Sequence, residues 1–304
     1  MRVEFRRWQF MRLEWPTITV IILCYALWLI VGFWLYPISP LLTLCIMVIL
    51  SALHSSLTHE AIHGHPTKNR LINEALVCFP LSLIYPYRRY RQTHLLHHRN
   101  TFLTDPFEDP ESYYLAWWQF KPMPYPVKQL LRVNNSMAGR LIFGPLLSAL
   151  AFITSDIRKM SKPSSAIWLG WLLHLPPCAI VLYCLYLMGI PFWVYLLGVC
   201  WPALSLMSLR SFAEHRWHET PEGRTIIVEH SPLSWLFLNN NLHVVHHYHP
   251  MEPWYKLPAL YKKDREKWQK RNDGYVYKNY FELWKAYGFK PKEPVVHPML
   301  DNST

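Results

Sequence analysis

Two long runs without a charged side chain constrain this 304-residue chain more than any other feature. The first covers the 45 residues between Glu14 and Glu60, and the second covers the 47 residues between Lys162 and Arg210. A helix needs about 20 apolar residues to cross a lipid bilayer. Each run is therefore too long for one crossing and long enough for two, and a proline-containing break divides each run near its middle.

These runs predict an all-α integral membrane protein, a single domain over residues 1–304 with about four transmembrane helices in two hairpins. The composition agrees, because only 17% of the residues are charged, against about 25% in soluble domains. Two shorter apolar stretches, 75–87 and 141–153, are too short to span and are predicted to be interfacial or re-entrant helices. The four predicted transmembrane helices cover about 17–36, 41–58, 166–188 and 191–209.

Basic side chains indicate the orientation of these helices. They gather at the N-terminus, between the two hairpins, and after Arg210, where residues of about 259–304 form a basic tail. The hairpin turns carry no charge. Because cytoplasmic loops are enriched in Lys and Arg, we expect a multi-pass protein of the inner or plasma membrane, if bacterial, with both termini in the cytoplasm. Anionic lipid and this bias explain the net charge of +11 without a nucleic-acid partner.

Half of the chain's 16 histidines fall into three clusters with helical spacing. Residues i and i+3 or i+4 share one face of a helix, so each cluster is expected to aim at one point. The first cluster should emerge just beyond the end of the second predicted transmembrane helix, and the others lie in cytoplasmic segments. All three can meet in one histidine-rich layer under the membrane. The clusters are His59 and His63; His94, His97 and His98; and His243, His246 and His247.

Eight imidazoles are more than one metal ion binds, so the count favours two metals, and imidazole suits Fe, Zn, Cu and Ni. His59-Glu60-Ala-Ile-His63 is also a literal H-E-x-x-H, the pattern of zinc metalloproteases, but such a protease needs no H-x-x-H-H clusters. A transporter is less favoured still, because its ligands would lie at the bilayer midplane. A soluble ferritin-like site needs two Glu-x-x-His motifs, and the clusters contain one.

The order and spacing of the three clusters resemble the histidine boxes of the membrane fatty acid desaturase and hydroxylase superfamily, over roughly residues 15–258. The segment from His247 through Pro253 to Leu257 also resembles the end of the third box in bacterial members. The resemblance implies a non-haem di-iron centre that uses O2 to attack an unactivated C–H bond, with all eight box histidines as ligands. It also implies a ninth ligand in the segment Arg210–His215, which we expect to be His215, with His218 as the alternative.

Ligand imidazoles usually need a hydrogen-bond acceptor for their second nitrogen. Five residues near the clusters are candidate acceptors, namely Glu60, Asp105, Asp109, Glu214 and Asn241. For Asp105 and Asp109 a solvated loop is an equal alternative, and for Asn241 helix capping is an alternative.

The resemblance leaves the reaction open between desaturation of a fatty acyl chain and hydroxylation or carotenoid-type ketolation. The apolar, aromatic-rich helices indicate a lipophilic substrate that enters between them. No dinucleotide-binding Gly-x-Gly-x-x-Gly motif or cytochrome-like segment is visible. We therefore expect a separate electron donor, such as a ferredoxin, a rubredoxin or a cytochrome. The basic tail is suited either to docking an acidic donor or to adhesion to anionic headgroups.

Overall fold

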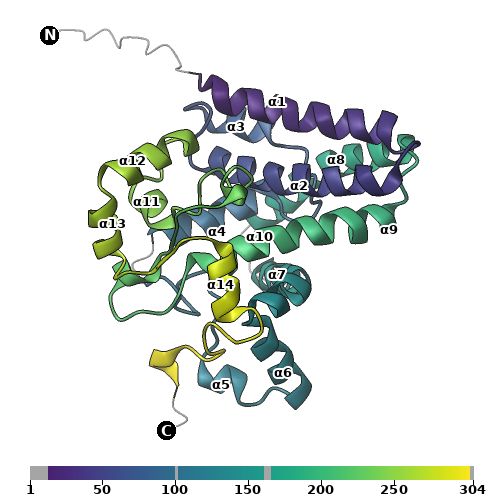
Figure 1. Ribbon diagram of the computed structural model, residues 1–304. Coiled ribbons are helices and arrows are strands. Elements are labelled where there is room, and N and C mark those ends of the chain that lie inside the picture. Colours follow the sequence, from purple (N-terminus) through teal and green to yellow (C-terminus); the bar gives the residue numbers. More distant parts are fainter. Residues whose placement is uncertain (1–12, 100–101, 161–165, 302–304) are drawn as a thin grey trace, which may run out of the picture.

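A computed structural model describes residues 13–99, 102–160 and 166–301 of the chain. The arginines of the N-terminal basic region lie outside these residues. Within them the chain is mainly helical, with a bundle of long apolar helices at one end and a cap of short helices at the other (Figure 1). The cap also contains a two-stranded parallel pair, β1 (Ile227–Val228) with β2 (Val276–Tyr277). The all-α membrane fold predicted from the sequence is confirmed.

The two predicted hairpins are present, and their helices agree with the predicted ranges to within five residues at each end. The first comprises α1 (Trp15–Ile30), which continues through a π-helical turn to Leu35, and α2 (Pro40–Ile62). The second comprises α8 (Ala166–Leu187) and a continuous helix made of α9 (Phe192–Tyr195), a π-helical turn (Leu196–Cys200) and α10 (Trp201–Glu214).

The interior of the bundle is apolar. Met47 of α2 and Tyr195 of α9 are fully buried, and the Trp28 indole of α1 donates to the Tyr195 hydroxyl at 3.1 Å. By contrast, many large apolar side chains on the outside of the bundle are exposed, as expected of helices that face lipid.

Helix α7 (Met137–Met160) extends well beyond the stretch 141–153, for which the sequence predicts an interfacial or re-entrant helix. It has 24 residues and is the fifth helix in the described part of the chain that is long and apolar enough to cross a membrane. The sequence prediction ended the helix at charged residues, but Arg140 and Asp156 are buried and satisfied inside the protein. Figure 1 looks almost along α7, whereas α1, α2 and α10 lie across the view. Helix α7 packs against α10 and runs crosswise to these three helices.

The helix predicted over 75–87 is wrong. Helix α3 (Arg70–Leu76) ends and α4 (Tyr87–Arg99) begins on either side of an irregular loop that contains Pro80 and Pro86. Side chains of the long helices bind the loop's carbonyl oxygens: Tyr195 donates to Leu81 O at 2.8 Å, and Tyr25 donates to Phe79 O at 3.1 Å. Irregular backbone is tolerated at membrane depth only where protein satisfies it, and these two hydrogen bonds meet that condition.

The remaining helices build the cap and the edge of the bundle. Helix α11 carries the third histidine cluster, and α12 and α13 cover it on the outside (Figure 1). Their bounds are α5 (Trp117–Phe120), α6 (Tyr125–Asn134), α11 (His243–Tyr248), α12 (Leu257–Lys263), α13 (Arg265–Arg271) and α14 (Tyr280–Tyr287).

Candidate metal centre

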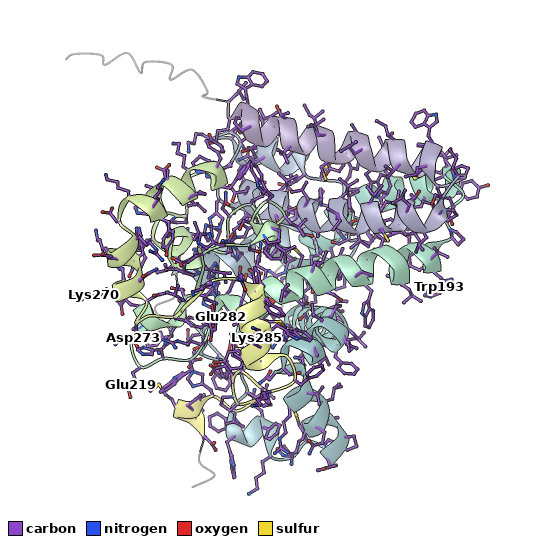
Figure 2. All side chains as sticks on the ribbon, viewed as in Figure 1. Trp193, Glu219, Lys270, Asp273, Glu282 and Lys285 are labelled. Atoms are coloured by element: carbon purple, nitrogen blue, oxygen red, sulfur yellow. The ribbon has the colours of Figure 1, made fainter. Side chains whose placement is uncertain are left out.

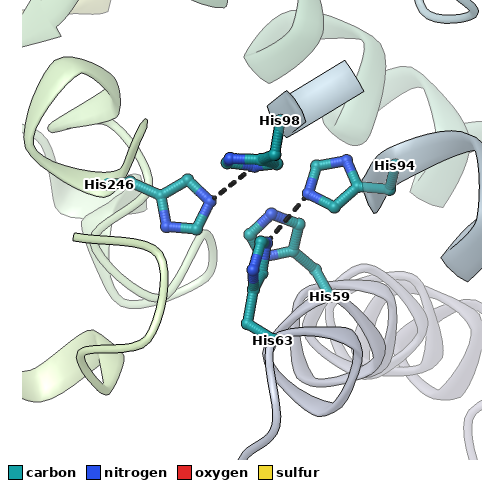
Figure 3. A group of neighbouring side chains, drawn as sticks. All are labelled: His59, His63, His94, His98 and His246. Atoms are coloured by element: carbon teal, nitrogen blue, oxygen red, sulfur yellow. Dashed lines mark hydrogen bonds between the residues drawn. The ribbon is translucent and has the colours of Figure 1, made fainter. Parts of the chain in front are cut away.

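Five histidines from three helices converge on one point between the bundle and the cap. In this first histidine group every imidazole offers a nitrogen within 4.8 Å of those of the others. Figure 3 shows the five rings facing a common centre, with 3.0 Å between the Nε2 atoms of His63 and His94. The members are His59 at the end of α2, His63 directly after it, His94 and His98 of α4, and His246 of α11.

Four further histidines form a second histidine group beside the first. Their ligand nitrogens also lie within 4.8 Å of one another. The Nε2 atom of His243 is 3.0 Å from that of His215 and 3.1 Å from that of His247. The members are His97 of α4, His215 directly after α10, and His243 and His247 of α11.

The expectation that each cluster aims at one point is wrong for the second and third clusters. His94 and His98 of α4 face the first group and His97 faces the second. Adjacent residues of an α-helix point about 100° apart, so a His-His pair on one helix serves two centres. The rings of His98 and His247, one from each group, stack with centroids 4.2 Å apart. Helices α4 and α11 thus place the two groups side by side.

Burial keeps most of these imidazoles neutral. It holds the pKa of His63, for example, well below its ordinary value, and neighbouring histidines lower it further. The same two causes act on the pKa of His94, His98, His215, His243, His246 and His247. The neutral imidazole is the form that binds a metal ion.

Two buried nitrogens indicate directly that the groups fit a cation. Among the described residues, His59 Nε2 in the first group and His97 Nε2 in the second have no hydrogen-bond partner. A buried nitrogen without a partner is costly in a folded protein. An all-imidazole donor set fits iron as well as zinc, copper or nickel, so each group has the residues needed to hold one metal ion.

Carboxylates orient two of the three imidazoles of α4, those of His94 and His97. His97 Nδ1 lies 2.8 Å from Asp109 Oδ1, and His94 Nδ1 lies 2.8 Å from Glu111 Oε1. Burial alone lowers the pKa of His97, but Glu111 and Asp109 outweigh it and raise this pKa to about 9. Both bonds leave Nε2 directed into a histidine group. The sequence singled out Asp109 but missed Glu111, because the acidic loop itself does not show which carboxylate turns inward.

A buried relay supports His243 of the second group. Asn240 Oδ1 lies 3.1 Å from His243 Nδ1, and Asn240 Nδ2 donates to Glu214 Oε1 at 2.8 Å. Glu214 also lies 2.9 Å from the buried guanidinium of Arg210, one turn earlier on α10. Asn240 therefore replaces Asn241 as the asparagine that contacts a histidine, since Asn241 Nδ2 donates to Val228 O instead.

Two other candidates, Asp105 and Glu60, form their hydrogen bonds with backbone N–H groups. Asp105 Oδ1 accepts from the backbone N–H groups of Phe107 and Glu108, so it caps the turn in front of Asp109. Glu60 Oε1 is 3.9 Å from the Nδ1 atom of its neighbour His59, and Glu60 Oε2 accepts from the Trp254 N–H at 3.2 Å. Glu60 thus ties the end of α2 to the segment after the third cluster.

The structure separates the two candidates for the ninth histidine. His215 joins the second group, whereas His218 turns away and contacts Asp273, whose carboxylate is 3.1 Å from its Nε2 atom. Lys292 from the C-terminal segment is buried and donates to the carbonyl oxygens of Phe212 and His215. It therefore caps the end of α10 at the residue that enters the group. Sequence reasoning missed this lysine, because its partners lie about 80 positions away.

Helix α4, which carries the second histidine cluster, is anchored to the bundle by a pair that the sequence did not predict. Arg89 of α4 binds Asp156 of α7 through two hydrogen bonds of 2.8 and 2.6 Å, and both side chains are buried. The Trp171 indole of α8 donates to the same carboxylate at 2.9 Å. Gly170 leaves room for this contact, because a Cβ atom there would lie 3.0 Å from Arg89 Cγ.

Residues 38–279 match the family model for fatty acid desaturases. That span covers most of the chain and contains all nine histidines of the two groups. The chain belongs to the fatty acid desaturase family. No individual curated protein matches the chain. Membership in this family implies an oxidoreductase, and the family's usual dependence on iron agrees with two histidine groups that could hold metal.

Proposed function

We propose that this desaturase-family protein desaturates a fatty acyl chain with O2, using two iron ions held by its nine converging histidines. The observation that carries the proposal is the pairing of a five-histidine group with a four-histidine group in direct contact. Nine imidazoles in two groups are more ligands than one metal ion binds, and they converge on two points rather than one. The zinc protease alternative accounts for His59, Glu60 and His63 only.

In this proposal the first histidine group holds one iron ion and the second histidine group holds the other. When bound, the iron pair supplies the activation of O2 that an unactivated C–H bond requires. The chain's own residues orient the imidazoles: Asp109 and Glu111 orient His97 and His94, and the Asn240 relay orients His243. Such partners typically account for a 10–100-fold difference in metal affinity or activity. Burial excludes water from the groups, as a reactive oxidant demands.

The proposed substrate is an acyl chain or another lipid that reaches the site from the membrane. Desaturation removes two hydrogens from adjacent carbons and, with two electrons and two protons from outside, reduces O2 to two waters. An apolar pocket of about 360 Å³ between α1, α8 and the loop before α4 supports an apolar substrate. None of the nine histidines lines this pocket.

The proposed topology places the cap, both termini and the two histidine groups in the cytoplasm. The whole chain acts as one domain, and the electrons come from a separate donor protein. The enrichment of Lys and Arg in the segments outside the hairpins supports this orientation.

Product analysis tests the proposal. The purified protein is supplied with iron, O2, a reductant and an isotope-labelled acyl lipid, and the products are analysed by mass spectrometry. A loss of two mass units is the expected result, with none in a His97→Ala variant and an unchanged yield in His218→Ala. A gain of sixteen units would assign hydroxylation to the same site. Peptide cleavage by a one-zinc protein would overturn the proposal.

A further inference from the structure

Helices α12 and α13 carry a dense cluster of exposed basic side chains. Residues 256–271 contain seven basic and two acidic residues. Two of the basic residues are paired, Lys256 with Glu252 and Arg265 with Glu229. The other five are exposed and, within the described part of the chain, no carboxylate pairs with them. We call these five residues the α12–α13 basic face: Lys262, Lys263, Lys267, Lys270 and Arg271.

This face lies directly outside the third histidine cluster. The Arg271 guanidinium sits 3.6 Å from the centroid of the Tyr248 ring, and Tyr248 follows His247 in the chain. The Trp268 ring of α13 is 5.8 Å from the Tyr248 ring and 5.7 Å from the His249 ring. Tyr248, His249 and Trp268 therefore form an aromatic layer beneath the α12–α13 basic face, and this layer begins at the residue next to His247 of the second histidine group.

The position of the face distinguishes a protein partner from a lipid surface. Figure 2 shows Lys270 and Trp193 at opposite ends of the molecule, and Trp193 belongs to the membrane hairpin. Figure 1 shows α12 and α13 at the outer end of the cap, beyond α11. A face that points away from the bundle meets the aqueous phase rather than the headgroups of the membrane that the bundle crosses.

We propose that the α12–α13 basic face docks the electron donor, and that the donor is a small acidic one-electron carrier protein. This inference rests on the proposed function. Each docking event oxidises the carrier by one electron and delivers that electron through the aromatic layer to the histidine groups. Two such events supply the two electrons that, with two protons from water and the two hydrogens of the substrate, convert O2 to two waters. Opposite charge accelerates such encounters and orients the partners.

Binding of oxidised carriers to the iron-loaded, detergent-solubilised protein tests the proposal without turnover. The probes are an acidic [2Fe–2S] ferredoxin and an acidic rubredoxin. The test variant replaces four lysines by glutamine: Lys262→Gln, Lys263→Gln, Lys267→Gln and Lys270→Gln. The matched control removes the same charge from four other exposed lysines: Lys121→Gln, Lys278→Gln, Lys285→Gln and Lys290→Gln.

The expected result is salt-sensitive binding of at least one carrier that weakens about tenfold or more in the test variant and stays near the wild-type value in the control. Equal weakening in both variants, or no binding of either carrier to the wild type, would overturn the proposal. So would an unchanged carrier affinity together with lost binding to anionic vesicles, which would make the face a lipid anchor. Product formation with a chemical reductant tests the proposed function separately, and the test variant should keep it.

Discussion

Glu214 and Asn240 are joined by a hydrogen bond of 2.8 Å between Oε1 and Nδ2, and this bond ties the end of α10 to the third histidine cluster. Asn240 in turn contacts His243, so one buried amide fixes an imidazole of α11 against a carboxylate of the second membrane hairpin. The site is thus built across the boundary between bundle and cap, and its geometry depends on their relative placement.

Replacing Asn240 by alanine should therefore lower metal affinity without unfolding the protein. Loss of such a partner typically costs 10–100-fold in affinity, and half of the bound metal should become sensitive to a chelator. Chelator competition followed by metal analysis measures this effect. Asn241→Ala is the matched control, because Asn241 holds the Val228 carbonyl rather than a histidine. Equal metal loss in both variants would show that the relay has no specific role.

Asp109→Asn should weaken the second group in a way that Asp105→Asn does not. Only Asp109 contacts His97, whereas Asp105 caps a turn. The substitution removes the charge that raises the basicity of His97 and leaves a similar shape, so about 10–100-fold lower metal affinity is expected. Iron titration of the two variants gives the comparison, and similar affinities for both would contradict the geometry.

The buried Arg89–Asp156 pair should contribute far more to stability than the partly exposed Arg88–Glu74 pair. Breaking a buried pair by removing one partner costs about 3–5 kcal/mol, so Asp156→Asn should lower the unfolding temperature clearly. Arg88→Gln removes the partly exposed pair with Glu74 and should cost about 1 kcal/mol or less. Thermal unfolding in one detergent measures both variants, and similar losses would refute the anchoring role of Asp156.

Acid should destabilise the metal-free protein. Seven imidazoles of the two histidine groups have a lowered pKa in the folded state and stay neutral there, while the unfolded chain binds protons below the ordinary pKa of about 6.5. They are His63, His94, His98, His215, His243, His246 and His247. Unfolding then takes up protons, so stability falls as the pH drops below that value, by about 1.4 kcal/mol per pH unit for each such group. His97 has the opposite sign, since its pKa of about 9 favours folding at lower pH. Seven groups outweigh one, and a pH-independent unfolding temperature between pH 8 and pH 5 would contradict this balance.

The sequence predicts the hairpins and the converging histidines well because both depend on local patterns. Charge-free runs define α1, α2, α8 and α10 regardless of tertiary contacts. Arg140 and Asp156 look like helix ends in the sequence, but Arg140 binds the nearby Asn134 carbonyl and Asp156 pairs with the distant Arg89, and α7 continues past both. Likewise Glu111 and Asn240 could not be distinguished from Asp105 and Asn241, because loop geometry alone decides which side chain turns toward a histidine.

The iron content of the purified chain tests the central claim most directly. Two irons per chain in the wild type and in His218→Ala, with about one in His215→Ala, is the result predicted by a five-histidine and a four-histidine group. A single metal ion per chain, or an iron content that His215→Ala leaves unchanged while His218→Ala lowers it, would contradict the account.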